Sequence, residues 1–396
     1  MIIGLVGAPS AGKSTFFKAS TLSEVEIANY PFTTIEKNEG MAYVKIDCVD
    51  KEFNTQCNPR FGQCLDHKRF VPIKIIDVAG LVPGAHAGKG RGNQFLDDLN
   101  QANALIHVID VSGSTTTEGE PVAPGTQDPV EIIKFLETEL DMWYLGILEK
   151  GWAKFARQVQ QEKLDINKSI AKQLSGLRVT EEIAKEATRG LSKQVQSWSE
   201  EDLITLAKAL RRITKPMLIA ANKIDIPGSK ENLEKIKKEF PDHIIIGCSA
   251  ESELALKEAA KKDLIKYIPG EDNFEILNKD KLSENQQKAL SFIKTNILEQ
   301  FKTTGVQGCL NKAVFDLLEM IAIFPGGVNN LTDKNGNTLP DCFLLEKDST
   351  ALDFAFHLHT DIGKGFIKAI NVKTKVSIGK DHKLNNRDVI EIKTRA

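Results

Sequence analysis

The 396-residue chain contains no apolar run that approaches the roughly 18 residues of a membrane-spanning helix. Its opening segment, MIIGLVG, has no basic leader and runs directly into a glycine-rich motif, so we expect no signal peptide. No sign of charge dominates: 52 Lys and Arg stand against 54 Asp and Glu, which argues against a surface coated in basic residues for nucleic-acid binding but leaves room for a local basic patch. We therefore expect a cytoplasmic protein.

Cysteine is also sparse, with six residues scattered along the chain. This usage indicates free thiols in a reducing compartment rather than a disulfide framework. One group is denser, because Cys48, Cys57, Cys64 and His67 fall within 20 residues and could bind Zn²⁺ tetrahedrally. The eight and six residues between these cysteines differ from the usual spacing of about two to four, so free or redox-active thiols are the alternative.

Apolar, β-branched runs alternate with helix-forming stretches along much of the chain. Strands this apolar are typical of a parallel sheet that helices cover on both faces. Their alternation with helices predicts a doubly wound α/β fold. The expected strands are Met1–Val6, Pro72–Val78, Ala104–Val111, Pro216–Ala221 and His243–Cys248.

A long charged interval separates the third expected strand from the fourth. It far exceeds the few tens of residues that one crossover helix needs. Residues 128–212 are rich in Glu, Lys, Gln and Leu and predict two or three long amphipathic helices, packed through Trp143, Trp152 and Trp198. The sequence thus predicts a helical insertion into an α/β domain that occupies residues 1–127 and 213–275.

The chain changes character after residue 275. Residues 276–324 predict a helical connector, with helices at Leu282–Gln300 and Gln307–Ile321. Residues 325–396 predict a compact β-rich module with one helix. Its expected elements are a turn at Asn335-Gly336, strands at Cys342–Leu345 and Val389–Ile392, and a helix at Ser349–His357 that Ser349 or Thr350 caps.

The first glycine-rich segment carries the most specific chemistry. Residues 7–14, GAPSAGKS, match G-x-x-x-x-G-K-[ST] between an expected strand and an expected helix, the context that a P-loop requires. The glycines let backbone N–H groups turn inward around phosphates, and the helix N-terminus adds partial positive charge. Lys13 is placed to reach the β- and γ-phosphates, and Ser14 to ligate Mg²⁺. The expected nucleotide contacts are Gly7, Ser10, Ala11, Gly12, Lys13, Ser14 and Thr15.

Asp77 ends the second expected strand, in the sequence Asp77-Val-Ala-Gly80. An acid at the carboxyl end of a parallel strand lies beside the bound ligand. We therefore expect Asp77 to hold Mg²⁺ through water and the Gly80 N–H to bond the γ-phosphate. Thr33 and Thr34 are candidates to complete the magnesium shell only when the γ-phosphate is present. The alternative for these threonines is an ordinary turn or strand pair.

Asn222-Lys223-Ile224-Asp225 follows the fourth expected strand and predicts recognition of guanine. The Asp225 carboxylate can accept hydrogen bonds from guanine N1–H and the 2-amino group, whereas adenine would set a lone pair against it. We expect Asn222 to support the loop and the Lys223 stem to cover the face of the ring. Ser249 and Ala250, after the fifth strand, are expected to bring a backbone N–H to guanine O6.

With these motifs the chain resembles the Obg-like GTPases, and most closely the archaeal form of the YchF branch. The resemblance spans nearly the whole chain and implies an inserted antiparallel coiled coil, a C-terminal TGS-like domain of β-grasp fold, and ribosomes or RNA as partners. It also implies Thr34 as the switch threonine. His86 takes a role in hydrolysis by the same resemblance, with a solvent-exposed loop histidine as the alternative. The residues that carry it are Gly7–Thr15, Asn29–Ile35, Asp77–His86 and Gly88–Asn93.

Three positions depart from the family pattern. Many YchF members carry Glu in place of Asp225 and prefer ATP, so the aspartate indicates GTP. Ser10 stands where the family often has an Asn that assists a monovalent cation, which leaves potassium dependence open. Leu81 stands where many GTPases have a Gln that orients the attacking water, so we expect slow intrinsic hydrolysis.

These observations predict a Mg²⁺-dependent switch that hydrolyses GTP to GDP and phosphate, with Lys13, Thr34, Gly80 and His86 as catalytic residues, and that acts on ribosomes or translation-linked RNA. The alternative is an RNA- or ribosome-binding module that uses the nucleotide structurally, with negligible turnover. A metabolic P-loop kinase fits less well, because it has no use for N-K-x-D. Residues 361–396 carry nine Lys and Arg against four Asp and Glu, which suits either a phosphate backbone or a solvated sheet face.

Overall fold

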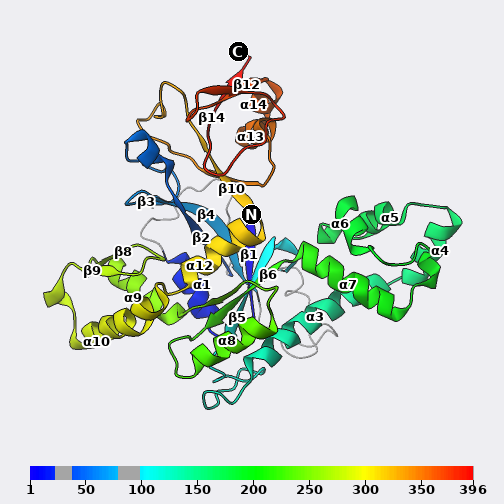
Figure 1. Cartoon of the computed structure of the whole chain (residues 1–396), viewed down its shortest axis with the longest axis horizontal. Coiled ribbons are helices and arrows are strands. Elements are labelled where there is room, and N and C mark those ends of the chain that lie inside the picture. The colour runs from blue at the N-terminus through cyan, green and yellow to red at the C-terminus, as the bar shows by residue number, and fades with distance from the viewer. Residues whose placement is uncertain (23–37, 79–98, 396) are drawn as a thin grey trace. The chain divides into compact units, whose positions relative to one another are not determined.

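The computed structural model describes residues 1–22, 38–78 and 99–395 (Figure 1). Its contacts divide the chain into two compact units. The first draws on residues 1–19, 36–40 and 74–309, and the second on residues 20–35, 41–73 and 310–396. Residues 41–73 thus group with the C-terminal part of the chain, although the predicted four-part division itself stays a prediction.

The first unit is built on a parallel sheet. Its five strands are those expected from the apolar runs, in the order β4-β1-β5-β6-β7, and each neighbouring pair is parallel. The predicted α/β sheet is therefore confirmed. Two strands that the sequence did not predict, β2 and β3, pair with β4, and β3 and most of β2 belong to the second unit. The bounds are β1 (Ile2–Val6), β2 (Glu39–Asp47), β3 (Gln63–Leu65), β4 (Lys68–Asp77), β5 (Ala104–Asp110), β6 (Met217–Asn222) and β7 (Ile245–Gly247).

Helices follow these strands along the chain and leave their amino ends near the carboxyl ends of the strands. A short antiparallel hairpin, β8 and β9, follows α9 and was not expected from the sequence. The elements are α1 (Lys13–Thr21), α8 (Ser229–Glu239), α9 (Ala250–Lys261), β8 (Ile265–Tyr267), β9 (Phe274–Ile276), α10 (Glu284–Ile293), a π-helical turn at Lys294–Leu298, α11 (Glu299–Phe301) and α12 (Val306–Lys312).

The insertion contains two long helices, α3 (Pro129–Glu149) and α7 (Glu200–Thr214), which pack along each other (Figure 1). Trp152, just beyond α3, stacks on Trp198, just before α7, with ring centroids 5.4 Å apart, so the two helices run in opposite directions. The predicted role of the tryptophans in helix packing is confirmed, because they lie in the buried core.

The two long helices agree with the predicted two or three. Three shorter helices that the sequence did not predict, α4 (Trp152–Gln161), α5 (Ile166–Gln173) and α6 (Glu181–Ala187), join them. The short polar side chains of Asp165 and Thr180 accept hydrogen bonds from backbone N–H groups at the starts of α5 and α6. Such caps start new helices and so divide into short helices a segment whose sequence has one continuous amphipathic pattern. Among the helices that the structure describes, none has the length and apolarity needed to cross a bilayer.

His107, in the middle of β5, is fully buried, and this burial lowers its pKa to about 3. The unfolded chain takes up this proton near the ordinary pKa of about 6.5, so between these values the unfolded state binds more protons than the folded one. The contribution to stability is complete above pH 6.5 and is lost as the pH falls toward 3.

We therefore expect the free energy of unfolding to fall by up to about 1.4 kcal/mol per pH unit below pH 6.5 because of this one group. Denaturant unfolding at a series of pH values measures the slope. The variant His107→Leu should have a shallower slope, whereas His382→Gln, at an exposed position, should keep the wild-type slope. Equal slopes for wild type and His107→Leu would contradict this account.

The second unit contains a five-stranded mixed sheet in the order β11-β10-β14-β12-β13, in which β10 and β14 are parallel. Phe354, on α13, packs with Ile323, Ala369 and Ile390 of the strands in one buried core. This arrangement agrees with the predicted β-grasp module. The elements are β10 (Met320–Pro325), β11 (Phe343–Glu346), α13 (Ala351–Leu358), α14 (Thr360–Lys364), β12 (Phe366–Asn371), β13 (Val376–Ile378) and β14 (Val389–Thr394).

The structure decides which residue caps α13 and corrects the predicted end of the helix before β10. Thr350, rather than Ser349, caps α13, in a capping box with Asp353. The helix expected at Gln307–Ile321 was too long, because its last π-helical turn ends at Leu317 and β10 begins at Met320. The apolar run MIAIF pairs with β11 and β14 instead, and this strand pairing outweighs helix propensity.

Candidate nucleotide-binding site

The candidate site lies at the carboxyl edge of the parallel sheet. The strand registers pair Leu5 with Asp77 and Asp110 with Asn222, so the ends of four neighbouring strands meet at this edge. Ligands of open α/β sheets bind outside this edge. The P-loop, the acid of D-x-x-G and the N-K-x-D segment therefore converge as the sequence predicted.

Backbone conformation explains the glycines of the P-loop. Gly7 has φ +148°, and a Cβ there would lie 2.2 Å from the carbonyl oxygen of Val108. Gly12 has φ +95°, and a Cβ there would lie 2.2 Å from Asn222 Nδ2. Ser10 also adopts a left-handed conformation, with φ +59°. The loop thus curls tightly against two neighbouring strand ends, and only glycine fits at its two closest approaches.

Lys13, Ser14 and Asp77 form the charged part of the site. Burial lowers the pKa of Lys13, while the nearby Asp77 carboxylate opposes this shift. Burial raises the pKa of Asp77, and the Lys13 charge and a hydrogen bond from the Ser14 side chain oppose it only in part. Asp77 Oδ1 is buried and accepts no hydrogen bond from any described residue. A carboxylate of this kind, beside a hydroxyl and an ammonium, fits a magnesium–phosphate group.

Asn222 ties the base-recognition segment to the phosphate loop. Its Nδ2 donates to the Ala11 carbonyl oxygen (3.1 Å), and its Oδ1 accepts from the Ala250 N–H (3.0 Å). Ser249 caps α9 by accepting from Ser252 N–H. The Ala250 N–H is therefore engaged by Asn222, so a guanine O6 contact in this loop would need another N–H. Asp225, three residues after Asn222 in the chain, is half-buried.

Lys223 is positioned by Asp110, a residue that the sequence reading missed. Lys223 has φ +64°, and its Nζ lies 2.7 Å from Asp110 Oδ2 and 3.0 Å from Thr115 Oγ1. Burial alone would raise the pKa of Asp110, but hydrogen bonds from Lys223, Ser112 and Thr115 outweigh it and hold the pKa below its ordinary value. The place of Asp110 at the end of a strand was the only signal available.

Five residues singled out above for the switch and for hydrolysis fall outside the described residues. They are Thr33, Thr34, Gly80, Leu81 and His86, which belong to residues 23–37 and 79–98. Their roles in magnesium binding and hydrolysis stay predictions.

The predicted cysteine group is brought together, with one change of membership. Sulfur atoms of Cys48, Cys57 and Cys64 and a carboxylate oxygen of Asp50 all lie within 4.8 Å of one another. His67 is not the fourth member, because its Nδ1 bonds Asp50 Oδ1 at 3.0 Å and so holds the carboxylate that takes its place. We call Cys48, Asp50, Cys57 and Cys64 the cysteine–aspartate cluster. All four residues belong to the second unit.

Models of three protein families match the chain: the 50S ribosome-binding GTPase family at residues 2–143, the G4 motif-containing domain of Obg-like GTPases of the YGR210-like group at residues 220–328, and the TGS domain at residues 328–394. A GTP-binding protein of Methanocaldococcus jannaschii is 51% identical over 100% of this chain and 99% of its own length. The ribosome-binding ATPase YchF of Bacillus subtilis is 29% identical over 93% and 87%.

Two solved structures are also similar to this chain over almost its full length. The crystal structure of a GTP-binding protein from Pyrococcus horikoshii OT3 is 39% identical, covers 100% of both chains and superposes with a TM-score of 0.79. The YchF GTPase of Schizosaccharomyces pombe superposes with a TM-score of 0.60 over 99% of this chain and 97% of its own, at 20% identity, which shows a shared fold.

Proposed function

The chain belongs to the Obg-like GTPases of the YchF type, and we propose that it hydrolyses GTP to GDP and phosphate as a magnesium-dependent switch that acts on the ribosome. The observation that supports this most is that one edge of the sheet holds the P-loop, Asp77 and the N-K-x-D segment. Asn222 of that segment is hydrogen-bonded to Ala11 of the P-loop and to Ala250 at the start of α9.

In this proposal the P-loop wraps the phosphates. Lys13 is partly desolvated by burial, which strengthens its attraction to the β- and γ-phosphate oxygens. Backbone N–H groups at the start of α1, which begins at Lys13, would point toward the same anion. Both features would stabilise the negative charge that develops on the leaving phosphate oxygen in the transition state.

Magnesium, when bound, supplies charge that offsets the triphosphate, and Ser14 and Asp77 are the described residues that would hold it. Thr34 would complete the shell. Gly80 and His86 would contact the γ-phosphate and the attacking water. These three residues carry the predicted link between nucleotide state and loop conformation.

Guanine selection falls to Asp225 in this proposal. Asn222 uses both ends of its amide within the protein, so it positions the loop rather than reads the base. The Lys223 stem, fixed by Asp110, would cover the ring. An adenine base would leave the half-buried Asp225 carboxylate opposite a lone pair, which is costly.

The ribosome is proposed as the partner because the B. subtilis relative is named a ribosome-binding ATPase and the matching family model is named for the 50S subunit. We expect intrinsic turnover of about 10⁻⁴–10⁻³ per second, and stimulation of at least about tenfold by ribosomes, since partners raise related rates by up to about 10⁵. Multiple-turnover phosphate release, with and without 50S subunits, measures both rates.

Lys13→Ala, mixed with the same ribosomes, is the control for contaminating GTPases. Turnover that stays at the unstimulated level with 30S, 50S and 70S particles would contradict the switch. It would favour the second candidate, a ribosome- or RNA-binding module that holds its nucleotide structurally, for which Leu81 in place of the water-orienting Gln is the supporting observation.

A further inference from the structure

The cysteine–aspartate cluster lies in the second unit, whereas the P-loop, Asp77 and the N-K-x-D segment belong to the first. Three of its members are almost completely buried: Cys48 is 1%, Asp50 0% and Cys57 3% exposed. Cys64 is half-buried. A buried carboxylate that faces three thiols is costly to maintain unless a cation neutralises it.

The distances within the cluster match one small metal ion. Cys48 Sγ and Cys57 Sγ are 3.4 Å apart, and Cys64 Sγ lies 3.6 Å from Asp50 Oδ2. Zinc bonds of about 2.3 Å to sulfur and 2.0–2.2 Å to oxygen place tetrahedral ligand atoms about 3.5–3.8 Å apart. The sulfur separation also exceeds the roughly 2.05 Å of a disulfide.

Local backbone geometry brings these four residues together. Cys48 and Asp50 flank the start of a 3₁₀ turn at Val49–Phe53, which ends at Asn54 in a left-handed conformation. Cys64 lies on β3, in a hairpin whose two-residue loop, Asp66-His67, has positive φ at both positions, as a type I′ turn requires. The Cys48 N–H donates to the His67 carbonyl oxygen (2.8 Å), which joins the turn to the hairpin.

The surroundings hold the ligand atoms in place, as second-shell groups do at zinc sites. His67 Nδ1 donates to Asp50 Oδ1, and the Cys57 N–H donates to Asp50 Oδ2 (2.9 Å). The Arg69 guanidinium, 1% exposed, lies 3.5 Å from Cys57 Sγ and donates to the carbonyl oxygens of Leu339 and Pro340. Its charge offsets part of the excess negative charge of three thiolates and a carboxylate around a divalent ion.

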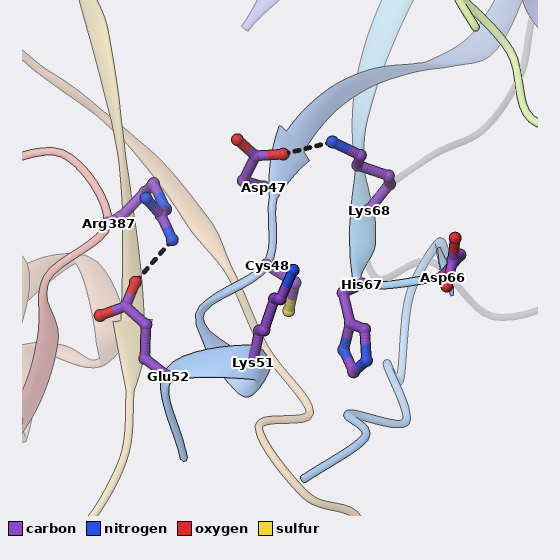
Figure 2. Close-up of a pocket in the computed structure, with 8 residues that line it drawn as sticks. All are labelled: Asp47, Cys48, Lys51, Glu52, Asp66, His67, Lys68 and Arg387. Atoms are coloured by element: carbon purple, nitrogen blue, oxygen red, sulfur yellow. Dashed lines mark hydrogen bonds and ion pairs between the residues drawn. The ribbon is translucent and has the colours of Figure 1, made fainter. Parts of the chain in front are cut away.

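A cavity borders the cluster at Cys48. A cavity of about 370 Å³ is lined by Cys48 and His67 together with charged side chains that include Lys51 and Arg387 (Figure 2). An entry path and a satisfied second shell are two of the features that a genuine metal site must show.

We propose that Cys48, Asp50, Cys57 and Cys64 bind one structural Zn²⁺ ion in a closed tetrahedral Cys₃Asp site. Soft thiolates select zinc over magnesium or calcium, and four protein ligands leave no open position for catalysis. Residues 54–62 connect the 3₁₀ turn to β3 without helix or strand, so the metal would act as the cross-link that orders this connection. The site is independent of the GTPase proposal.

The direct test is the zinc content of the untagged full-length chain, purified under reducing conditions and measured by inductively coupled plasma mass spectrometry. We expect about one zinc per chain in the wild type, and less than about 0.1 in Cys57→Ser and Asp50→Asn. Two controls should keep the wild-type content: Cys309→Ser, at a buried thiol of the first unit, and Asp66→Asn, at an exposed acid next to the cluster.

Wild-type protein alone also tests the ligands, in case the variants fail to fold. Apo-protein titrated with Co²⁺ should give the visible bands of tetrahedral cobalt and sulfur-to-cobalt charge transfer at one equivalent. His67→Ala, which removes a positioning residue and no ligand, should retain these bands but bind Zn²⁺ about 10–100-fold more weakly. Wild type without zinc and without these cobalt bands, or with Cys48 and Cys57 recovered as a disulfide, would overturn the proposal.

Discussion

Asparagine in place of Asp225 is expected to lower the affinity for GTP by about 100-fold or more and to create affinity for xanthosine triphosphate. The carboxylate is proposed to accept two hydrogen bonds from guanine, each worth about 1.5–3 kcal/mol because one partner is charged. An amide can donate to the xanthine oxygen where the carboxylate accepted from the guanine amino group. Titration of wild type and Asp225→Asn with GTP, ATP and XTP measures the change.

Asp242→Asn, which removes an exposed acid from the same unit, is the matched control and should bind all three nucleotides as the wild type does. Because the B. subtilis relative is named an ATPase, this experiment also compares GTP with ATP as the preferred nucleotide. Tight ATP binding by the wild type, with base preference unchanged in Asp225→Asn, would show that this carboxylate does not read the base.

Alanine in place of Gly12 is expected to reduce nucleotide affinity by about 150–5,000-fold. The new Cβ would meet Asn222 Nδ2 at 2.2 Å, so the Asn222 side chain must move and give up its bonds to Ala11 and Ala250. Two lost hydrogen bonds at about 1 kcal/mol each, with about 1–3 kcal/mol of backbone strain at φ +95°, give this range. Equilibrium binding of a fluorescent GDP analogue measures it.

Gly151→Ala separates strain from collision. Gly151 has φ +87°, nearly the same as Gly12, but a Cβ there would meet nothing within 4 Å. The control should therefore lose some stability and keep its affinity for nucleotide. An equal loss of affinity in both variants would mean that the contact between Gly12 and Asn222 has no special role.

The sequence predicted the parallel strands and the nucleotide motifs because these features are local. An apolar run such as Ala104–Val111 identifies a buried strand without any knowledge of its neighbours. The P-loop and N-K-x-D segments likewise contain their chemistry within a few residues, and strand order then brings them to one edge.

Features that depend on distant partners were missed. Nothing near Asp110 in the sequence shows that Lys223 will contact it, since the pair forms only when β5 and β6 lie side by side. Asp50 was passed over as a member of the cysteine group because a 3₁₀ turn, rather than a motif, brings it beside Cys64. Pairing with β11 likewise makes Met320–Phe324 a strand, although the sequence predicted that a helix continues to Ile321.

The long helical pair of the insertion has a mechanical consequence. α3 has 21 residues and is therefore about 30 Å long. Ile132 and Ile133 near its start pack in one buried core with Ile109 of β5 and Ile219 of β6, while the stacked pair of Trp152 and Trp198 lies beyond its far end. A tilt of about 10° at the sheet would carry that far end about 5 Å, given a lever of this length. A small rotation of α3 at the sheet would thus displace the far end of the insertion by about the length of one helical turn.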